Sequence, residues 1–110
     1  QLGWVETVGG PRSPIALDGD AVDLCDELDP DLVVLVGDAG LGTVNAVLVS
    51  ADPFDDRDLV VVLNRFDPAE SLHRRNRDWL ATREGLEVVT DPEALASHLA
   101  ARLPGRRARR

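Results

Sequence analysis

The chain has 110 residues, 44% of them hydrophobic, which is enough for one small domain with a buried core. Its net charge is −8, and because an acidic surface repels phosphate backbones we expect no nucleic-acid partner. The best apolar run, residues 32–36, has the length of a strand rather than of a membrane span, so we expect no membrane partner.

The absence of Lys is the most restrictive feature of the composition, since all 12 basic residues are Arg. A phosphate-binding loop of the form Gly-x-x-x-x-Gly-Lys-Ser/Thr needs its Lys to reach the β- and γ-phosphates of a nucleotide, so this chain cannot contain one. The chain begins with Gln1 and has no Met. We therefore expect that an amino-terminal segment is missing.

The single cysteine and the two histidines limit the covalent and metal chemistry. Cys25 cannot form an internal disulfide, and one Cys with two His cannot complete a zinc site. We interpret Cys25 as a small core residue on a helix at residues 22–28. This cysteine usage favours a reducing compartment, and we expect a cytoplasmic protein.

Four short apolar runs alternate with helical signals along the chain. The runs are continuous rather than alternating, which is typical of strands covered on both faces in a parallel sheet. Strand–helix–strand alternation predicts an open α/β fold with right-handed crossovers. The runs lie at residues 2–5, 32–36, 59–63 and 88–89, and helices are expected at residues 22–28, at residues 43–51, from Asp67 to Gly85, and after Asp91.

Polar or glycine-rich segments follow each of these runs. In open parallel sheets, ligands bind beyond the carboxyl ends of the strands. We therefore expect the four segments to converge on one edge of the sheet. They are residues 6–10, 37–45, 64–67 and 90–92.

Glu6 is followed at a short distance by Gly9 and Gly10. A carboxylate at a strand end can bind a hard cation such as Mg²⁺, and the glycines would let backbone amides approach phosphate oxygens. The alternative is a surface carboxylate before a tight turn.

Residues 37–43 resemble a phosphate-binding loop without its Lys. One interpretation is a turn that brings the backbone close to a ligand or a partner subunit. The other is a flexible turn that leads into a helix with Thr43 as its N-cap.

Asn64 and Asp67 have the Asn-x-x-Asp spacing at a strand end. An Asn side chain can both donate to and accept from a base edge. The alternative for Asn64 is an ordinary loop residue, and for Asp67 we prefer the role of helix N-cap.

The remaining distinctive side chains have structural interpretations. Trp79 is expected to anchor the core. Four residues early in the same helix are expected to form a charged, solvent-facing surface, and His98 is expected to be structural or exposed. The four are His73, Arg74, Arg75 and Arg77.

Three segments together resemble dethiobiotin synthetase, especially divergent forms from high-GC bacteria. They are Val5-Glu6-Thr7-Val8-Gly9-Gly10-Pro11-Arg12-Ser13-Pro14, Gly40-Leu41-Gly42-Thr43-Val44-Asn45 and Val62-Leu63-Asn64-Arg65-Phe66-Asp67-Pro68. The resemblance covers residues 2–92. It implies the carboxyl-terminal part of a P-loop NTPase-like (Rossmann-like) α/β fold, with a mostly parallel sheet and flanking helices, whose amino-terminal phosphate-loop half is missing.

The resemblance also implies an activity, a ligase of biotin biosynthesis. Such an enzyme is a homodimer that uses ATP as co-substrate, Mg²⁺ and CO₂ to close a ureido ring on the diamine 7,8-diaminononanoate. Glu6 would bind Mg²⁺, and the residues from Glu6 to Gly9 would face the nucleotide phosphates. The other nucleotide-binding residues implied are Asn64 and Arg65, with Asp91 and Pro92 as a poorer match. The substrate-binding residues implied are Leu41, Gly42, Thr43, Val44 and Asn45.

The sequence departs from the family pattern at several positions. Thr7-Val8 replaces Gly-Ala, Ala46 stands where the family often has His, and the segment 52–58 is shorter than usual. The family's catalytic Lys residues belong to the missing half, so no catalytic residue is expected in this chain, which should be inactive alone. We assign residues 1–103 to the synthetase-like domain and residues 104–110 to a basic tail.

Two alternatives remain open. The chain could be a non-catalytic α/β dimerisation module that lost nucleotide chemistry. It could also belong to a relative with different chemistry, such as the P-loop amidoligases of cobyrinate synthesis.

Overall fold

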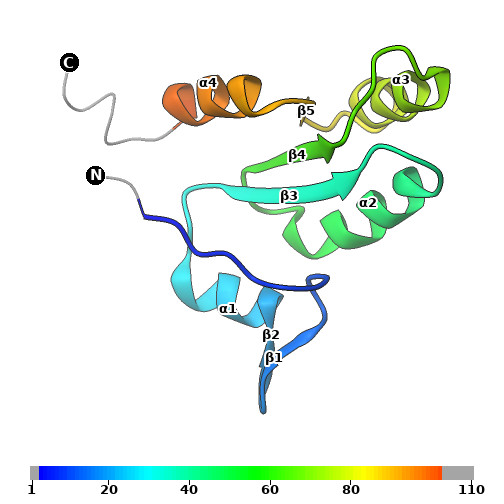
Figure 1. The fold of residues 1–110 in the computed structure, drawn as a ribbon. Coiled ribbons are helices and arrows are strands. Elements are labelled where there is room, and N and C mark those ends of the chain that lie inside the picture. Colours follow the sequence, from blue (N-terminus) through cyan, green and yellow to red (C-terminus); the bar gives the residue numbers. More distant parts are fainter. Residues whose placement is uncertain (1–2, 103–110) are drawn as a thin grey trace. The chain divides into compact units, whose positions relative to one another are not determined.

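The computed structural model describes residues 3–102 and divides the chain into two compact units, Gln1–Asp31 and Leu32–Arg110, which are described separately (Figure 1). Leu103 and the basic tail predicted at residues 104–110 lie outside the described residues. Within residues 3–102, no helix combines the length and the apolar character that crossing a membrane requires.

The first unit contains a small hairpin and one helix. Strands β1 (Pro14–Ala16) and β2 (Gly19–Asp20) pair antiparallel, and α1 (Ala21–Leu28) follows directly. The Asp20 side chain accepts from the Asp23 amide and the Asp23 side chain accepts from the Asp20 amide, which is a complete capping box. The helix predicted at residues 22–28 is therefore confirmed, although Cys25 on it is only half-buried.

The strand predicted at residues 2–5 is wrong for its described part, residues 3–5. This segment has no regular structure, and Trp4 and Val5 are 61% and 63% exposed. An apolar run becomes a strand only where a neighbouring strand takes its hydrogen bonds, and within this unit none does. The hairpin was missed, although Asp18-Gly19, where the turn enters β2, is a dipeptide typical of turns.

The second unit is a three-stranded parallel sheet of order β3-β4-β5 with helices between the strands. The predicted α/β class and the three strands after the first apolar run are confirmed. Strands β3, β4 and β5 span Val33–Asp38, Leu59–Asn64 and Val88–Val89. The helical elements are α2 (Thr43–Ala51), η1 (Asp52–Phe54), α3 (Ser71–Asp78), η2 (Trp79–Arg83) and α4 (Pro92–Arg102).

The core of this unit forms where the central strand β4 meets the helices. Val61 and Leu63 of β4 are fully buried and cluster with Val47 of α2 and Leu80 of η2. One face of the sheet thus packs against both crossover helices. Gly37 permits this packing, since a Cβ there would lie 3.1 Å from Cγ2 of Val47.

The opposite face of the sheet is covered unevenly. Side chains alternate between faces along a strand, so Val60 and Val36 point away from the face that carries Val61. Val60 is fully buried, whereas Val36 is 61% exposed. Strand β3 has a neighbouring strand only on the β4 side among the described residues. The free side of β3 and Val36 therefore remain accessible in this unit.

One predicted helix cap and one predicted helix start differ from the structure. Gly42, with φ 87°, occupies the cap position of α2, and Thr43 is its buried first residue rather than the N-cap. Helix α3 begins at Ser71 rather than after Asp67, because the Asp67 side chain accepts from the Ala69 amide and holds a separate turn first. The cap predicted at Asp91 is confirmed, since its side chain accepts from the Ala94 amide at 2.7 Å.

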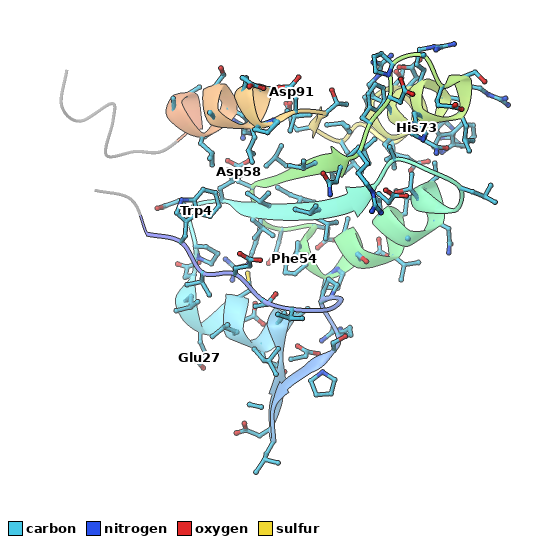
Figure 2. The ribbon with its side chains drawn as sticks, viewed as in Figure 1. Trp4, Glu27, Phe54, Asp58, His73 and Asp91 are labelled. Carbon is cyan, nitrogen blue, oxygen red and sulfur yellow. The ribbon has the colours of Figure 1, made fainter. Side chains whose placement is uncertain are left out.

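The prediction that Trp79 anchors the core is wrong. Helix α3 continues into η2, a π-helical turn in which the Glu84 amide donates to the carbonyl of Trp79. The wider turn changes the residue spacing, so the next residue, Leu80, is fully buried instead. Trp79 is 49% exposed, and its indole N–H donates to Glu84. Phe54, labelled in Figure 2, is the aromatic residue that is buried, at 5% exposed.

Candidate functional site

The ends of β3 and β4 place two polar residues side by side. Asp38 and Asn64 are register partners at the carboxyl ends of these parallel strands. Both side chains are exposed. The predicted meeting of the segments after these two strands is therefore confirmed, and the loops containing Leu41 and Arg65 start from the same edge.

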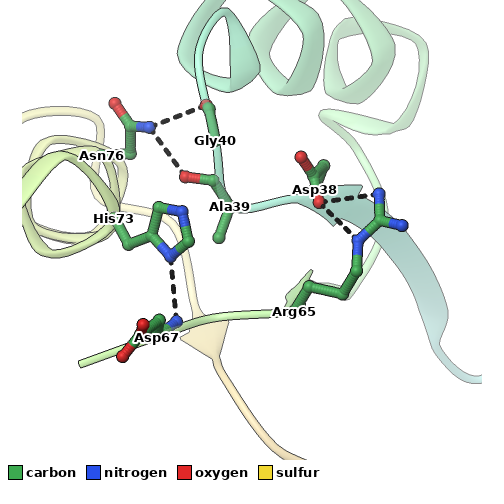
Figure 3. Close-up of polar contacts among 7 residues, drawn as sticks. All are labelled: Asp38, Ala39, Gly40, Arg65, Asp67, His73 and Asn76. Atoms are coloured by element: carbon green, nitrogen blue, oxygen red, sulfur yellow. Dashed lines mark hydrogen bonds and ion pairs between the residues drawn. The ribbon is translucent and has the colours of Figure 1, made fainter. Parts of the chain in front are cut away.

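An ion pair connects the two loops. Nε of Arg65 donates to Oδ1 of Asp38 at 3.1 Å, and its Nη2 lies 3.0 Å from the same oxygen (Figure 3). Arg65 adopts a left-handed conformation with φ 57°, which is uncommon for a residue with a Cβ. Both side chains are more than half exposed, so we infer that the pair orients the loops more than it stabilises the fold.

The Asp38 carboxylate was missed by the sequence analysis, which considered it only as part of a glycine-rich turn. Its hydrogen bond from Arg65 is the main cause that lowers its pKa below the usual value, with the Arg65 charge and the amides of Gly40 and Ala39 acting in the same direction. Asp38 is therefore ionised at neutral pH and holds both Arg65 and the start of the loop.

Replacing Arg65 by Gln is expected to raise the pKa of Asp38 towards its ordinary value, because the charged donor is lost. A lowered pKa in the folded state means that the contribution of Asp38 to stability is present above the unfolded-state pKa and is lost as pH falls through the folded-state pKa. Carboxyl ¹³C NMR titration measures this change. Arg77→Gln, which removes an ion pair with Asp78 instead, is the matched control and should leave Asp38 unchanged.

Residues 39–43 form a loop with a fixed base and an exposed tip. Ala39 is fully buried, and the Asn76 side-chain amide donates to the carbonyls of Ala39 and Gly40, both at 2.9 Å. Leu41 at the tip is 92% exposed, and Gly42 has a positive φ. Asn76 was not singled out in the sequence, where nothing distinguishes it from the charged residues around it.

The five residues that the resemblance assigned to the substrate divide into two groups. Leu41, Gly42 and Asn45 are exposed, whereas Thr43 is 5% exposed and Val44 packs against the core. A shallow groove of about 190 Å³ runs between β3 and the start of α2. Its lining includes Gly37, Asp38, Leu41, Gly42, Thr43 and Ala46.

The turn after Asn64 is held by α3. The Asp67 amide donates to Nδ1 of His73 at 2.9 Å, and Arg74 donates to the Pro68 carbonyl. The Arg77 guanidinium lies 5.2 Å from the centre of the Phe66 ring. The predicted solvent-facing surface is therefore wrong for His73, Arg74 and Arg77, which are half-buried, and holds only for Arg75, which is exposed.

The segment containing Glu6 lies in the first unit. All of residues 3–10 are exposed, and Val8 is 86% exposed. Gly9 has φ 86°, and a Cβ there would lie 3.0 Å from the Ser13 hydroxyl oxygen, so glycine is required at this turn. Glu6 and Thr7 thus precede a tight turn, as the sequence indicated.

The donor set available for a metal is small. Within residues 3–102, no group of three or more His, Cys, Asp or Glu side chains is arranged to hold a metal ion. Glu6 offers one exposed carboxylate, and Mg²⁺ is usually bound by one or two carboxylates together with water and substrate phosphates.

Asp91 and Pro92 follow β5 and begin α4. The Asp91 side chain caps this helix, and in the described part of the chain no hydrogen bond or ion pair connects it to the loops after β3 and β4. Figure 2 labels Asp91 at the start of α4.

Comparison with known proteins finds curated relatives among the dethiobiotin synthetases. The chain is 38% identical over 93 residues to an ATP-dependent dethiobiotin synthetase of Haloferax mediterranei, which covers 82% of this chain and 40% of the relative. It is 28% identical over 91 residues to an ATP-dependent dethiobiotin synthetase of Brachyspira hyodysenteriae, which covers 77% of this chain and 41% of that protein.

The chain thus spans about two fifths of the length of the curated relatives it matches. No family model matches the chain, and no solved structure matches it significantly. The sequence matches and the parallel α/β sheet agree with the resemblance predicted from the three segments. The chain is therefore related to a part of the ATP-dependent dethiobiotin synthetases.

Proposed function

We propose that this chain is the carboxyl-terminal part of an ATP-dependent dethiobiotin synthetase, and that it works together with an amino-terminal part that carries the phosphate-binding loop. The observation that carries the proposal is the register pairing of Asp38 with Asn64, which puts the two loops after β3 and β4 at one edge of the sheet. The sequence match to two such synthetases supports it.

The proposed nucleotide contacts follow the resemblance residue by residue. The exposed side chain of Asn64 would contact the base, with Arg65 beside it. Glu6 would bind the Mg²⁺ that accompanies the phosphates, and the backbone from Thr7 to Gly9 would face the phosphate oxygens. Asp91 and Pro92 would border the nucleotide less directly, since Asp91 already caps α4.

The proposed diamine site is the loop between β3 and α2. Leu41 and Asn45 offer an apolar and a polar contact at the exposed tip and on the first turn of α2. Gly42 lets the backbone approach a ligand. Thr43 is buried and Val44 packs against the core, so both residues support the loop. In a homodimer this exposed tip would reach the site of the partner subunit.

The proposed reaction proceeds through a carbamate. One amine of the diamine adds to CO₂ and loses a proton, and the carbamate oxygen then attacks the γ-phosphorus of ATP and displaces ADP. The second amine attacks the resulting mixed anhydride, so the ureido ring closes as phosphate leaves. Mg²⁺ and backbone amides would offset the anionic charge that gathers, and the Lys residues for this step would come from the amino-terminal part.

A direct assay of the complete protein tests this proposal. The complete protein is this chain joined to the amino-terminal part that we expect to precede it. Incubation with the diamine, ATP, Mg²⁺ and ¹⁴C-bicarbonate should yield a labelled cyclic urea and one ADP for each ring closed. ATP consumption without label in the diamine product would contradict the proposed reaction.

Replacing Glu6 by Gln is expected to weaken the binding of Mg-ATP by about tenfold in the complete protein, because a neutral amide is a poorer ligand for a hard cation. Binding of ATP without Mg²⁺ should change little. Titration calorimetry with and without Mg²⁺ measures both values. Glu27→Gln, an exposed carboxylate on α1, is the matched control (Figure 2). An unchanged affinity in both titrations would remove Glu6 from the site.

A non-catalytic dimerisation module is the second candidate, and exposed apolar side chains favour it. Leu41, Val49 and Val36 are 92%, 63% and 61% exposed. Such side chains are typical of surfaces that another chain covers. A complete protein that dimerises but binds no nucleotide would support this candidate over the ligase.

A further inference from the structure

Asn76 of α3 contacts the loop after β3 although the two are far apart in sequence. Its Nδ2 donates to the carbonyl oxygens of Ala39 and Gly40, both at 2.9 Å, and the side chain is half-buried (Figure 3). Carbonyl oxygens only accept hydrogen bonds, and a side-chain amide has two N–H groups, one for each of them. A carboxylate of the same shape cannot make either bond.

Asp38 directly precedes the same two residues and binds Arg65 across to the next loop. The backbone amides of Ala39 and Gly40 help to lower the pKa of its carboxyl group. We call Asp38 and Asn76 together the loop clamp.

The loop clamp lies between two proposed subsites. On one side the loop continues to Leu41, whose side chain is 92% exposed, and into α2. On the other side Asp38 pairs in register with Asn64 and binds Arg65. Burial of Ala39 fixes the start of the loop, but Gly40 and Gly42 have no side chain to restrict the backbone that follows.

We propose that Asn76 is a positioning residue for the loop between β3 and α2, where the proposed diamine site lies. It fixes the peptide groups of Ala39 and Gly40. It thereby sets where Leu41 and Asn45 lie relative to the nucleotide subsite at Asn64. This inference rests on the proposed function. Asn76 itself touches neither substrate, so its effect is transmitted through the loop. A displacement of about 1 Å in such a loop is enough to change substrate handling markedly.

The test compares Asn76→Asp with two other variants in the complete protein. Asn76→Asp has the same shape without the donors, Asn76→Gln keeps the donors on a longer stem, and Arg75→Ala removes an exposed side chain from the same helix. We expect Asn76→Asp to raise KM for the diamine about tenfold and to leave KM for ATP within about twofold. Asn76→Gln should recover part of the loss, and Arg75→Ala should match the wild type.

A merely structural role would give a different pattern. Partial unfolding lowers kcat through the active fraction and leaves both KM values unchanged. That pattern would overturn the proposal, and so would an equal rise in both KM values.

Amide hydrogen exchange separates failure of this inference from failure of the proposed function. Asn76→Asp should speed exchange at residues 40–43 and leave β4 unchanged, with or without substrates. If the wild-type protein does not turn over the diamine, the proposed function fails while the loop clamp is still tested by exchange. Unchanged exchange at residues 40–43 would refute the loop clamp itself.

Discussion

Replacing Leu63 by Ala is expected to lower the free energy of unfolding of the complete protein by about 3 kcal/mol. Leu63 is fully buried on the central strand β4 and clusters with Val47, Val61 and Leu80. The variant loses the transfer free energy of the removed carbons and leaves a cavity between the sheet and two helices, which cannot close without moving them. Denaturant unfolding followed by far-UV circular dichroism measures the change.

Leu41→Ala is the matched control for this experiment. The same atoms are removed from a side chain that is 92% exposed, so the free energy of unfolding should change by less than about 0.5 kcal/mol. Similar losses in the two variants would mean that Leu63 is not the core residue described here, or that Leu41 is covered in solution.

The isolated 110-residue chain is expected to self-associate. In the described residues β3 has a strand neighbour on one side only. Val36 of this strand, on the sheet face opposite the one that carries Val61, is 61% exposed. A free strand edge with exposed valine is a ready template for pairing with another copy. Sedimentation velocity should show a larger average mass as concentration rises, and thermal unfolding should depend on concentration.

Val36→Lys should reduce this association, because a charged side chain next to a free edge opposes strand pairing. Val49→Lys on α2 is the matched control, since Val49 is exposed to almost the same extent, 63%, but lies on a helix. A sharp, reversible transition that is independent of concentration in the unmodified chain would contradict the expectation. Equal effects of the two substitutions would assign the association to general surface hydrophobicity instead.

The parallel sheet of the second unit could be predicted because its strands are continuous apolar runs. The runs at residues 32–36, 59–63 and 88–89 each became a strand, and α2 begins and ends as expected, at Thr43 and Ala51. In these segments the local pattern and the packing agree. The run at residues 2–5 has the same character, but its described residues have no strand beside them in the first unit and remain irregular.

The start of α3 and the exposure of Trp79 could not be predicted from single residues. Asp67-Pro68 is a valid start signal, yet the Asp67 side chain binds the Ala69 amide, and its own amide binds His73. The π-helical turn at Trp79 brings Leu80 rather than Trp79 into the core, and this outcome depends on tertiary packing. Local signals do not specify such long-range choices.

The candidate site was predicted in outline and missed in its supporting contacts. Asn64 and Leu41 were found because they follow apolar runs. Asp38 and Asn76 were missed, because their roles depend on Arg65, 27 residues from Asp38, and on a loop 36 and 37 residues from Asn76. The amino-acid sequence alone has no local pattern from which these long-range contacts could be predicted.

Isothermal titration of the complete protein with ATP, in the presence and absence of Mg²⁺ and of the diamine, tests the central claim most directly. The claim is that loops at the ends of neighbouring parallel strands gather around one nucleotide and its diamine partner. We predict Mg²⁺-dependent binding of ATP, with diamine binding at a separate subsite on the same protein. Absence of any Mg²⁺-dependent nucleotide binding in the folded, complete protein would contradict it.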